Sequence, residues 1–217
     1  MEKKKKDIIE YDGIIMDSFE ELYIYWFFQE LQKKGYVHSI ERSASFTLSL
    51  PLVVEYDETV ILKTKSKIVH KKQTLLKEKI YTPDFTVKWT EKGVNEFVHC
   101  LIRQDTLKLD LSRKVEKLFI GEFLEWQREG DKNIWVSYIE VKSDFFDPQN
   151  MERIFKNNQA VVWDRFKIFV NLVHPQELFF NSFFPAKYLI TNKSGKKRKI
   201  NGDLPILTLE QYLNKTK

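Results

Sequence analysis

Two short stretches of the sequence carry residues whose types and spacing suit the hydrolysis of phosphodiesters. They are Pro83-Asp84 and, much later in the chain, Glu140-Val141-Lys142. Carboxylates bind Mg²⁺, which prefers oxygen ligands and which lowers the pKa of a bound water and polarises a phosphoryl oxygen. A neighbouring lysine can orient that water or stabilise developing negative charge. We therefore predict that Asp84 and Glu140 hold a metal ion, with the Val141 carbonyl as a third ligand and Lys142 assisting.

The elements predicted around these residues place them at the ends of strands. Residues 80–89 predict a strand, because apolar and polar side chains alternate after Asp84. Residues 134–142 predict a second strand, in which residues two apart share a face, so that Glu140 and Lys142 project together. Apolar residues precede them on that face. An acid and a base therefore close a buried strand.

A third acid is available on a helix predicted over about residues 18–34. Ser18 and Glu21 fit a capping box at its start, and Gly35 supplies the stop. Glu20 and Glu21 both lie in the first turn, where the helix dipole favours an anion. The alternative is a glutamate that only caps the helix, and spacing alone favours that alternative.

The other predicted elements complete a mixed order of helices and strands. They are strands at 46–50, 59–62, 96–102 and 167–173, helices at 149–165 and about 176–184, and either a short helix or further strands within 111–126. This order predicts a central mixed β-sheet flanked by helices, in an α/β fold, with α+β character equally consistent. Because the chain shows no repeat and no linker, residues 1–217 are expected to form one domain.

The charge balance is modestly basic. The formal net charge is +5, which suits a polyanionic partner and is equally typical of a lysine-rich solvated surface. Two segments concentrate the lysines, residues 63–79 and the C-terminal tail Lys193–Lys199. Each either grips backbone phosphates or forms a solvated loop.

The cysteine count and the apolar runs indicate the compartment. Cys100 is the single cysteine, so no disulfide can form within the chain, and it is expected to be a small core residue rather than a nucleophile. With four dispersed histidines, the sequence offers no zinc spacing. No signal-like region and no apolar run of about 20 residues is present, which predicts a cytoplasmic protein without a membrane segment.

Together these residues resemble the PD-(D/E)XK superfamily of nucleases. Its hallmark is a Pro-Asp at a strand start, followed by an acid-x-Lys on the adjacent strand. The sequences of residues 81–85 and 138–142 are similar to those of small phage-type endonucleases, junction resolvases and transposon end-cutting subunits. The resemblance covers about residues 15–175. It implies a restriction-endonuclease-like core and a Mg²⁺-dependent endodeoxyribonuclease, with Mn²⁺ able to substitute, and it places the helix acid on Glu21, with Glu20 as the fallback.

The sequence departs from the superfamily between the two motifs, where the intervening segment is long. Residues 90–133 are expected to include an insertion, either a hairpin, a dimer contact or a substrate-recognition element. Gln159 and Trp163 share a helix face and resemble the Gln-x-x-x-Tyr feature of some relatives, although Trp replaces Tyr and a buried Trp is ordinary core. Asp144 and Asp147 are expected at a loop and a helix start, with a second-metal role as the alternative.

The resemblance implies DNA, duplex or branched, as the substrate, and a homodimer by analogy alone. The alternative is a non-catalytic nucleic-acid-binding or assembly protein on the same fold. The intact Asp84, Glu140 and Lys142 argue against it, because a site freed from catalysis has no reason to keep all three. A third interpretation is that the motif is a coincidence in an unrelated interaction domain.

Overall fold

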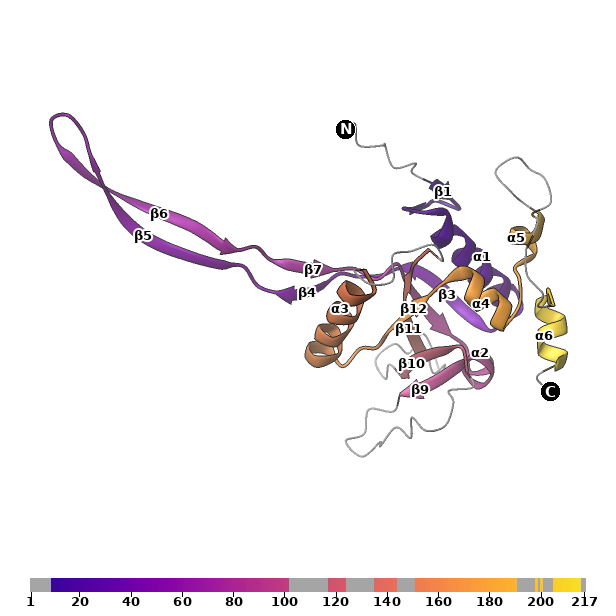
Figure 1. The fold of residues 1–217 in the computed structure, drawn as a ribbon. Helices are drawn as coiled ribbons and strands as arrows, with labels where there is room; N and C mark the ends of the chain where they lie inside the picture. The colour runs from indigo at the N-terminus through magenta and orange to yellow at the C-terminus, as the bar shows by residue number, and fades with distance from the viewer. Residues whose placement is uncertain are drawn as a thin grey trace.

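A computed structural model of the protein describes residues 9–101, 117–123, 135–143, 151–190, 198, 200 and 205–215. It shows a mixed α/β body with a central mixed sheet, from which a long two-stranded arm projects (Figure 1). In chain order the elements are β1 (Ile9–Tyr11), β2 (Ile14–Met16), α1 (Phe19–Lys33), β3 (Val37–Arg42), β4 (Phe46–Ser49), β5 (Leu52–Ile61), β6 (Ser66–Leu76), β7 (Lys79–Tyr81), β8 (Phe85–Trp89), α2 (Glu91–Phe97), β9 (Val98–Leu101), β10 (Phe119–Phe123), β11 (Trp135–Val141), α3 (Met151–Phe166), β12 (Val170–Val173), α4 (Pro175–Asn181), α5 (Ala186–Ile190) and α6 (Leu209–Lys215).

The central sheet branches at β11. Its order is β3-β8-β11-β10-β9, and β12 also pairs with β11. Strand β10 runs antiparallel to the first part of β11, whereas β12 runs parallel to its last part. The Asn171 side chain sits at this branch: its Nδ2 donates to the carbonyls of Ile120 and Tyr138, at 2.8 and 3.0 Å, and its Oδ1 accepts from the Ile120 amide. A buried amide thus replaces the ladder bonds lost where the strands diverge.

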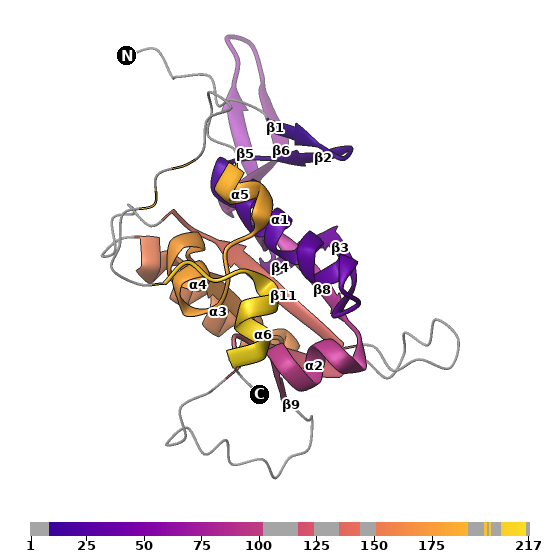
Figure 2. The ribbon, with the colours of Figure 1, turned by 90° about the vertical axis from the view of Figure 1, so that its right-hand side faces the viewer.

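Helix α1 packs on one face of the sheet and confirms the predicted helix. The Ser18 hydroxyl caps it by accepting from the Glu21 amide, as the capping box predicts. Ile24, Phe27 and Phe28 are fully buried along it. Helices α4 and α5 contact α1 on its other side (Figure 2). The apolar side chains that surround the middle of α1 are therefore covered by the sheet and by these helices.

Helix α3 covers the opposite face of the sheet. Tyr138 packs into a cluster with Phe155 and Val162 of α3, whereas its neighbour Ile139 lies in the main core beside α1. Because successive residues of a strand point to opposite faces, β11 is buried on both sides. The alternation predicted for β8 is also confirmed, with Phe85 and Val87 fully buried.

Several predicted boundaries are wrong. The single strand expected over residues 80–89 is divided into β7 and β8, which belong to different sheets, and the strand expected at 59–62 is the end of the longer β5. The strand expected from residue 96 begins at Val98, because α2 occupies the preceding residues with Thr90 as its cap. The strand expected from residue 167 begins at Val170, since Lys167 has a φ of 57° and ends the α3 turn. The helix expected to reach residue 184 ends at Asn181 as α4.

The arm consists of β5 and β6, paired antiparallel through ten registered positions from Leu52↔Leu76 to Ile61↔Ser66. Nearly all of its residues are exposed. The short β4–β7 ribbon joins it to the body, with Phe46 opposite Tyr81. The segment at 90–133, where an insertion is expected, supplies α2, β9 and β10 to the body in its described part. In the part of the chain that is described, no helix is long and apolar enough to cross a membrane.

Candidate active site

The pairing of β8 with β11 brings the two sequence motifs together. The strands are antiparallel and pair Phe85 with Ile139, so Asp84 and Glu140 are the next residues outward in the two strands. The Val141 amide donates to Asp84 Oδ2 at 2.6 Å. The start of one strand and the end of the other thus meet at one edge of the sheet, as the sequence predicts.

Glu140 is held from two sides. It is 7% exposed, and its Oε2 accepts a hydrogen bond from the Tyr81 hydroxyl at 2.9 Å. Its Oε1 forms an ion pair with Lys142 Nζ, the residue two positions further along the strand. Tyr81 closes β7, so the ribbon that carries the arm also contributes a side chain to the site.

Glu21 lies in the first turn of α1 and is 5% exposed. Its Oε2 accepts from Arg42 Nη1 at 2.7 Å and from the Asp17 amide at 3.1 Å. Arg42 pairs with Phe85 in the β3–β8 register and lies over its ring, 5.3 Å from the centroid. Arg42 therefore links Glu21 to the start of β8, next to Asp84.

The site carries more negative charge than its surroundings neutralise. Burial and the neighbouring charge of Glu140 raise the pKa of Asp84 to about 7, and Glu21 adds to this effect. The Val141 amide and Lys142 oppose it without cancelling it. Burial, followed by the charge of Glu140, also raises the pKa of the Tyr81 hydroxyl, which therefore acts as a hydrogen-bond donor. The mutual repulsion between Glu21, Asp84 and Glu140 is what a bound cation would relieve.

The residues present fit a hard divalent cation. Asp84 and Glu140 follow the last registered pair of β8 and β11, and their charges act on each other. Both offer carboxylate oxygens, the ligand type that Mg²⁺ and Mn²⁺ prefer. Among the described residues, no three or more His, Cys, Asp or Glu side chains are already gathered as a metal-binding group. A Mg²⁺ ion would therefore be held by Asp84 and Glu140, with the rest of its shell from water, substrate or backbone. The Val141 carbonyl stays a predicted ligand.

The predicted site residues lie near one another, and their roles stay predictions. Glu21, Asp84, Glu140 and Lys142 come together, and the charge of Glu21 acts on Asp84. Glu20 is half-buried in the same helix turn. Sequence reasoning missed Tyr81 and Arg42, although the first stands three positions before Asp84.

The other residues predicted from the sequence either take a clear position in the structure or lie outside the residues that it describes. Gln159 Nε2 donates to the Val170 carbonyl at 2.5 Å and so ties α3 to β12. Trp163 is 43% exposed and is therefore not ordinary core. Asp144, Asp147, the Cys100 side chain and, except for Arg198, the tail at 193–199 lie outside the described residues. Arg198 donates to the Tyr23 hydroxyl at 2.8 Å.

Comparison with known proteins adds no relative. No protein-family model matches the chain, and no curated protein or solved structure matches it.

Proposed function

We propose that the protein is a metal-dependent DNA endonuclease with a restriction-endonuclease-like core. The observation that carries this proposal is that Asp84, Glu140 and Lys142 lie together where β8 begins and β11 ends, with Glu21 near them on α1. The arrangement of the elements supports the fold assignment. The two motif strands are central and antiparallel, α1 brings the third acid, and α3 leads into β12, which is parallel to the end of β11.

In this proposal each side chain has a separate task. Bound Mg²⁺ supplies Lewis-acid chemistry, because it lowers the pKa of a coordinated water and draws charge from a phosphoryl oxygen. Asp84 and Glu140 hold the ion, and Lys142 stabilises negative charge on the reacting phosphate or orients the attacking water. Glu21, fixed by Arg42, completes the acidic face of the site.

The experiment that tests the proposal is nicking of a supercoiled plasmid by the purified chain. We expect open-circular product in Mg²⁺ or Mn²⁺ and none in EDTA. A panel of junction, flap, duplex and single-stranded substrates then identifies the preferred DNA. If neither metal supports cleavage of any of these substrates, the nuclease proposal is wrong and a non-catalytic role on this fold takes its place.

We expect Tyr81→Phe to slow cleavage by about 10–100-fold, the scale of one lost hydrogen bond to a charged carboxylate. Tyr81 is a positioning residue, because its hydroxyl holds Glu140 Oε2 while the ring stays in the core. The loss should appear as a higher Mg²⁺ concentration for half-maximal rate, since Glu140 is then less well oriented. Tyr36→Phe, a buried tyrosine beside the opposite end of β8, is the matched control. A Tyr81→Phe variant with an unaltered Mg²⁺ dependence contradicts this role.

A further inference from the structure

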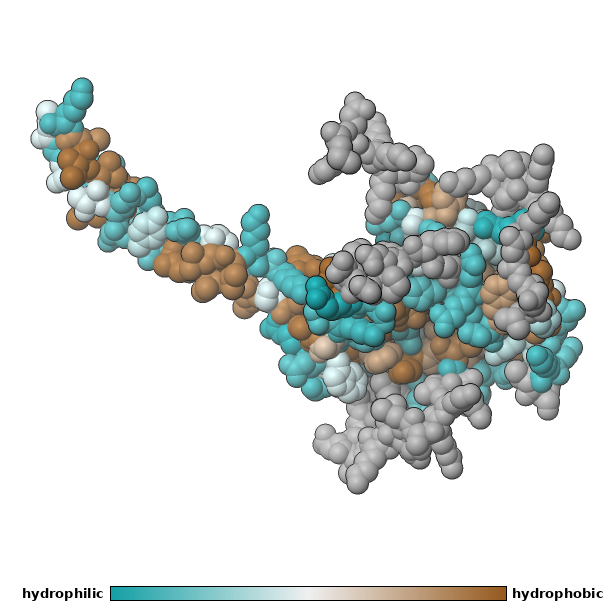
Figure 3. Space-filling model, viewed as in Figure 1, coloured by the Kyte–Doolittle hydropathy of each residue, from teal (hydrophilic) through white to brown (hydrophobic). Residues whose placement is uncertain are grey.

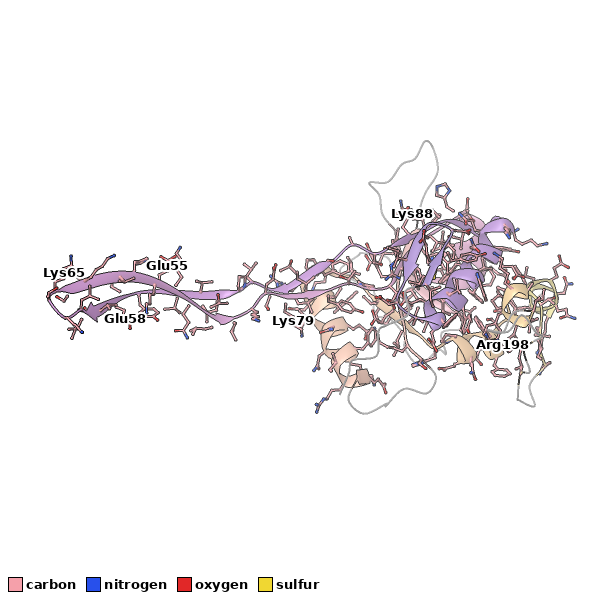
Figure 4. All side chains as sticks on the ribbon, turned by 90° about the horizontal axis from the view of Figure 1, so that it is seen from above. Glu55, Glu58, Lys65, Lys79, Lys88 and Arg198 are labelled. Atoms are coloured by element: carbon pink, nitrogen blue, oxygen red, sulfur yellow. The ribbon has the colours of Figure 1, made fainter. Side chains whose placement is uncertain are left out.

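The β5–β6 arm has a shaft whose acids are paired and a tip whose lysines are not. Along the shaft each acidic side chain contacts a side chain across the ribbon. Glu55 and Glu58 form ion pairs with Lys72, at 2.6 Å, and with Lys71, and Asp57 is hydrogen-bonded to the His70 ring at 2.8 Å. The ribbon therefore uses its acids internally, and Figure 4 shows Glu55 and Glu58 on this shaft.

The tip carries three lysines that the shaft does not neutralise. Lys63, Lys65 and Lys67 are exposed, and within residues 9–101 none of them forms an ion pair. The turn is closed by a hydrogen bond from the Leu62 amide to the Lys65 carbonyl at 2.8 Å. Figure 4 places Lys65 at the extreme end of the arm. The turn and the first residues of β6 thus carry three exposed lysines.

Apolar side chains stand beside these lysines. Ile61 is 85% exposed and Ile68 is 68% exposed, and the hydropathy colouring shows hydrophobic side chains close to the tip (Figure 3). A two-stranded ribbon alone is marginally stable in water, so an exposed one gains from a partner that covers it. A basic tip with apolar side chains matches the chemistry of ribbons that enter a DNA groove, where lysines meet phosphates and apolar residues contact bases.

The dimensions of the arm suit a duplex that also reaches the candidate active site. The ten residues of β5 span about 33 Å, close to one turn of B-DNA. The root of the arm is at the site itself, because Tyr81 of β7 donates to Glu140. The chain from Tyr81 to Lys65 can extend by at most about 55 Å, which corresponds to roughly 16 base pairs.

We propose that the arm is a DNA-binding element whose tip, Lys63, Lys65 and Lys67, enters a groove of duplex DNA away from the cleaved phosphate. This inference rests on the proposed function, because it takes the duplex to continue from the Asp84–Glu140 site. The tip contacts backbone phosphates and so adds affinity and orientation rather than a sequence code. The substrate class is accordingly a duplex that extends at least one helical turn to one side of the cut.

The test compares the Lys63→Ala/Lys65→Ala/Lys67→Ala variant with the wild type in binding to a labelled 40-base-pair duplex, without divalent metal. Three lost phosphate contacts should lower the slope of log K against log salt by about 2.7 and weaken binding by about 10²-fold near 0.1 M salt. The matched control is Lys33→Ala/Lys34→Ala/Lys215→Ala, which removes the same charge at the end of α1 and on α6, opposite the arm (Figure 1). The control should keep the wild-type slope.

A second measurement uses duplexes of increasing length, and its result for the wild type does not depend on how any variant folds. A 10-base-pair duplex is too short to touch both the site and the tip. Wild-type affinity should therefore rise more steeply between 10 and 30 base pairs than that of the tip variant. An unchanged salt slope, or an equal fall in the control, overturns the inference. So does a tip variant that alters the sedimentation coefficient but not DNA affinity, because the tip then packs on protein.

The two proposals fail separately in these assays. Plasmid nicking with a salt slope that is independent of the tip overturns the arm inference and leaves the nuclease proposal in place. A tip-dependent slope without nicking in Mg²⁺ or Mn²⁺ overturns the nuclease proposal and leaves the arm as a DNA contact.

Discussion

Lys142→Ala should lower the rate of Mg²⁺-dependent cleavage by about 10²–10⁴-fold while leaving the affinity for DNA within a few-fold of the wild type. The ammonium of Lys142 lies against Glu140 at the end of β11, where it can act on the reacting phosphate. An interaction made mainly in the transition state lowers the rate constant and changes substrate binding little. Single-turnover nicking with enzyme in excess measures this rate without a contribution from product release.

The matched control is Lys156→Ala, an exposed lysine on α3 that pairs with Glu152. It removes the same charge from the surface, and we expect an unchanged cleavage rate. Urea unfolding of both variants separates a lost catalytic group from a lost fold. A Lys142→Ala variant that is folded and nicks plasmid at the wild-type rate shows that Lys142 was assigned wrongly.

The sequence could predict the site to the extent that local patterns define it. Alternation after Asp84 locates β8, and the apolar stretch that ends at Lys142 locates β11, because a buried strand shows in its own residues. The capping box identifies the start of α1 and with it Glu21. These predictions of two strands and of a helix start depend on neighbours within a few positions, and the structure confirms the elements.

The missed residues depend on pairing between distant segments. Tyr81 reaches Glu140 because β4 and β7 form a ribbon, and Arg42 reaches Glu21 because β3 pairs with β8. Neither pairing leaves a local signal in the sequence. Helix α2 did leave one, since Thr90 precedes Glu91 as a cap, but seven residues are too few for a clear helical period.

The arm shows what local composition leaves open. The β-formers at residues 59–62 predict a strand, and the structure confirms it but extends it over Leu52–Ile61 and exposes nearly all of it on both faces of the ribbon. Burial depends on whether another layer covers a strand, and that information lies elsewhere in the chain. The cross-strand register also decides which lysines of residues 63–79 stand opposite an acid and which do not, and the sequence alone does not give this register.

Asp84→Asn is expected to stabilise the metal-free protein at pH 8 by about 2–4 kcal/mol, although it should also abolish cleavage. The folded state raises the pKa of Asp84 from its ordinary value of 3.8 to about 7, so folding favours the protonated carboxyl. The stability lent by that proton is complete below about pH 4. This stability is lost as the pH rises toward 7, and above pH 7 the buried ionised carboxylate lowers the free energy of unfolding by its full amount.

A neutral asparagine resembles the protonated carboxyl, and its oxygen can still accept the hydrogen bond from the Val141 amide. The difference in unfolding free energy between Asp84→Asn and the wild type should therefore be close to zero at pH 4. It should grow up to pH 7 and then stay level. Urea denaturation at pH 4, 6 and 8 measures this curve. Asp164→Asn, an exposed position on α3, is the control and should differ from the wild type by less than about 0.5 kcal/mol at each pH.

Addition of enough Mg²⁺ should reverse the order of the two proteins. An ion held by Asp84 and Glu140 would stabilise only the folded wild type, by about 4.1 kcal/mol at a concentration one thousand times its dissociation constant, which offsets the advantage of the variant. The variant lacks one of the two carboxylates and should gain little. If Asp84→Asn is less stable than the wild type at pH 8 without metal, the Asp84 carboxylate is compensated in the fold, and its repulsion by Glu140 is not the basis of metal binding. A destabilising acid that becomes a stabilising one when Mg²⁺ is present is the behaviour expected of a site built to hold a cation rather than to hold the fold together.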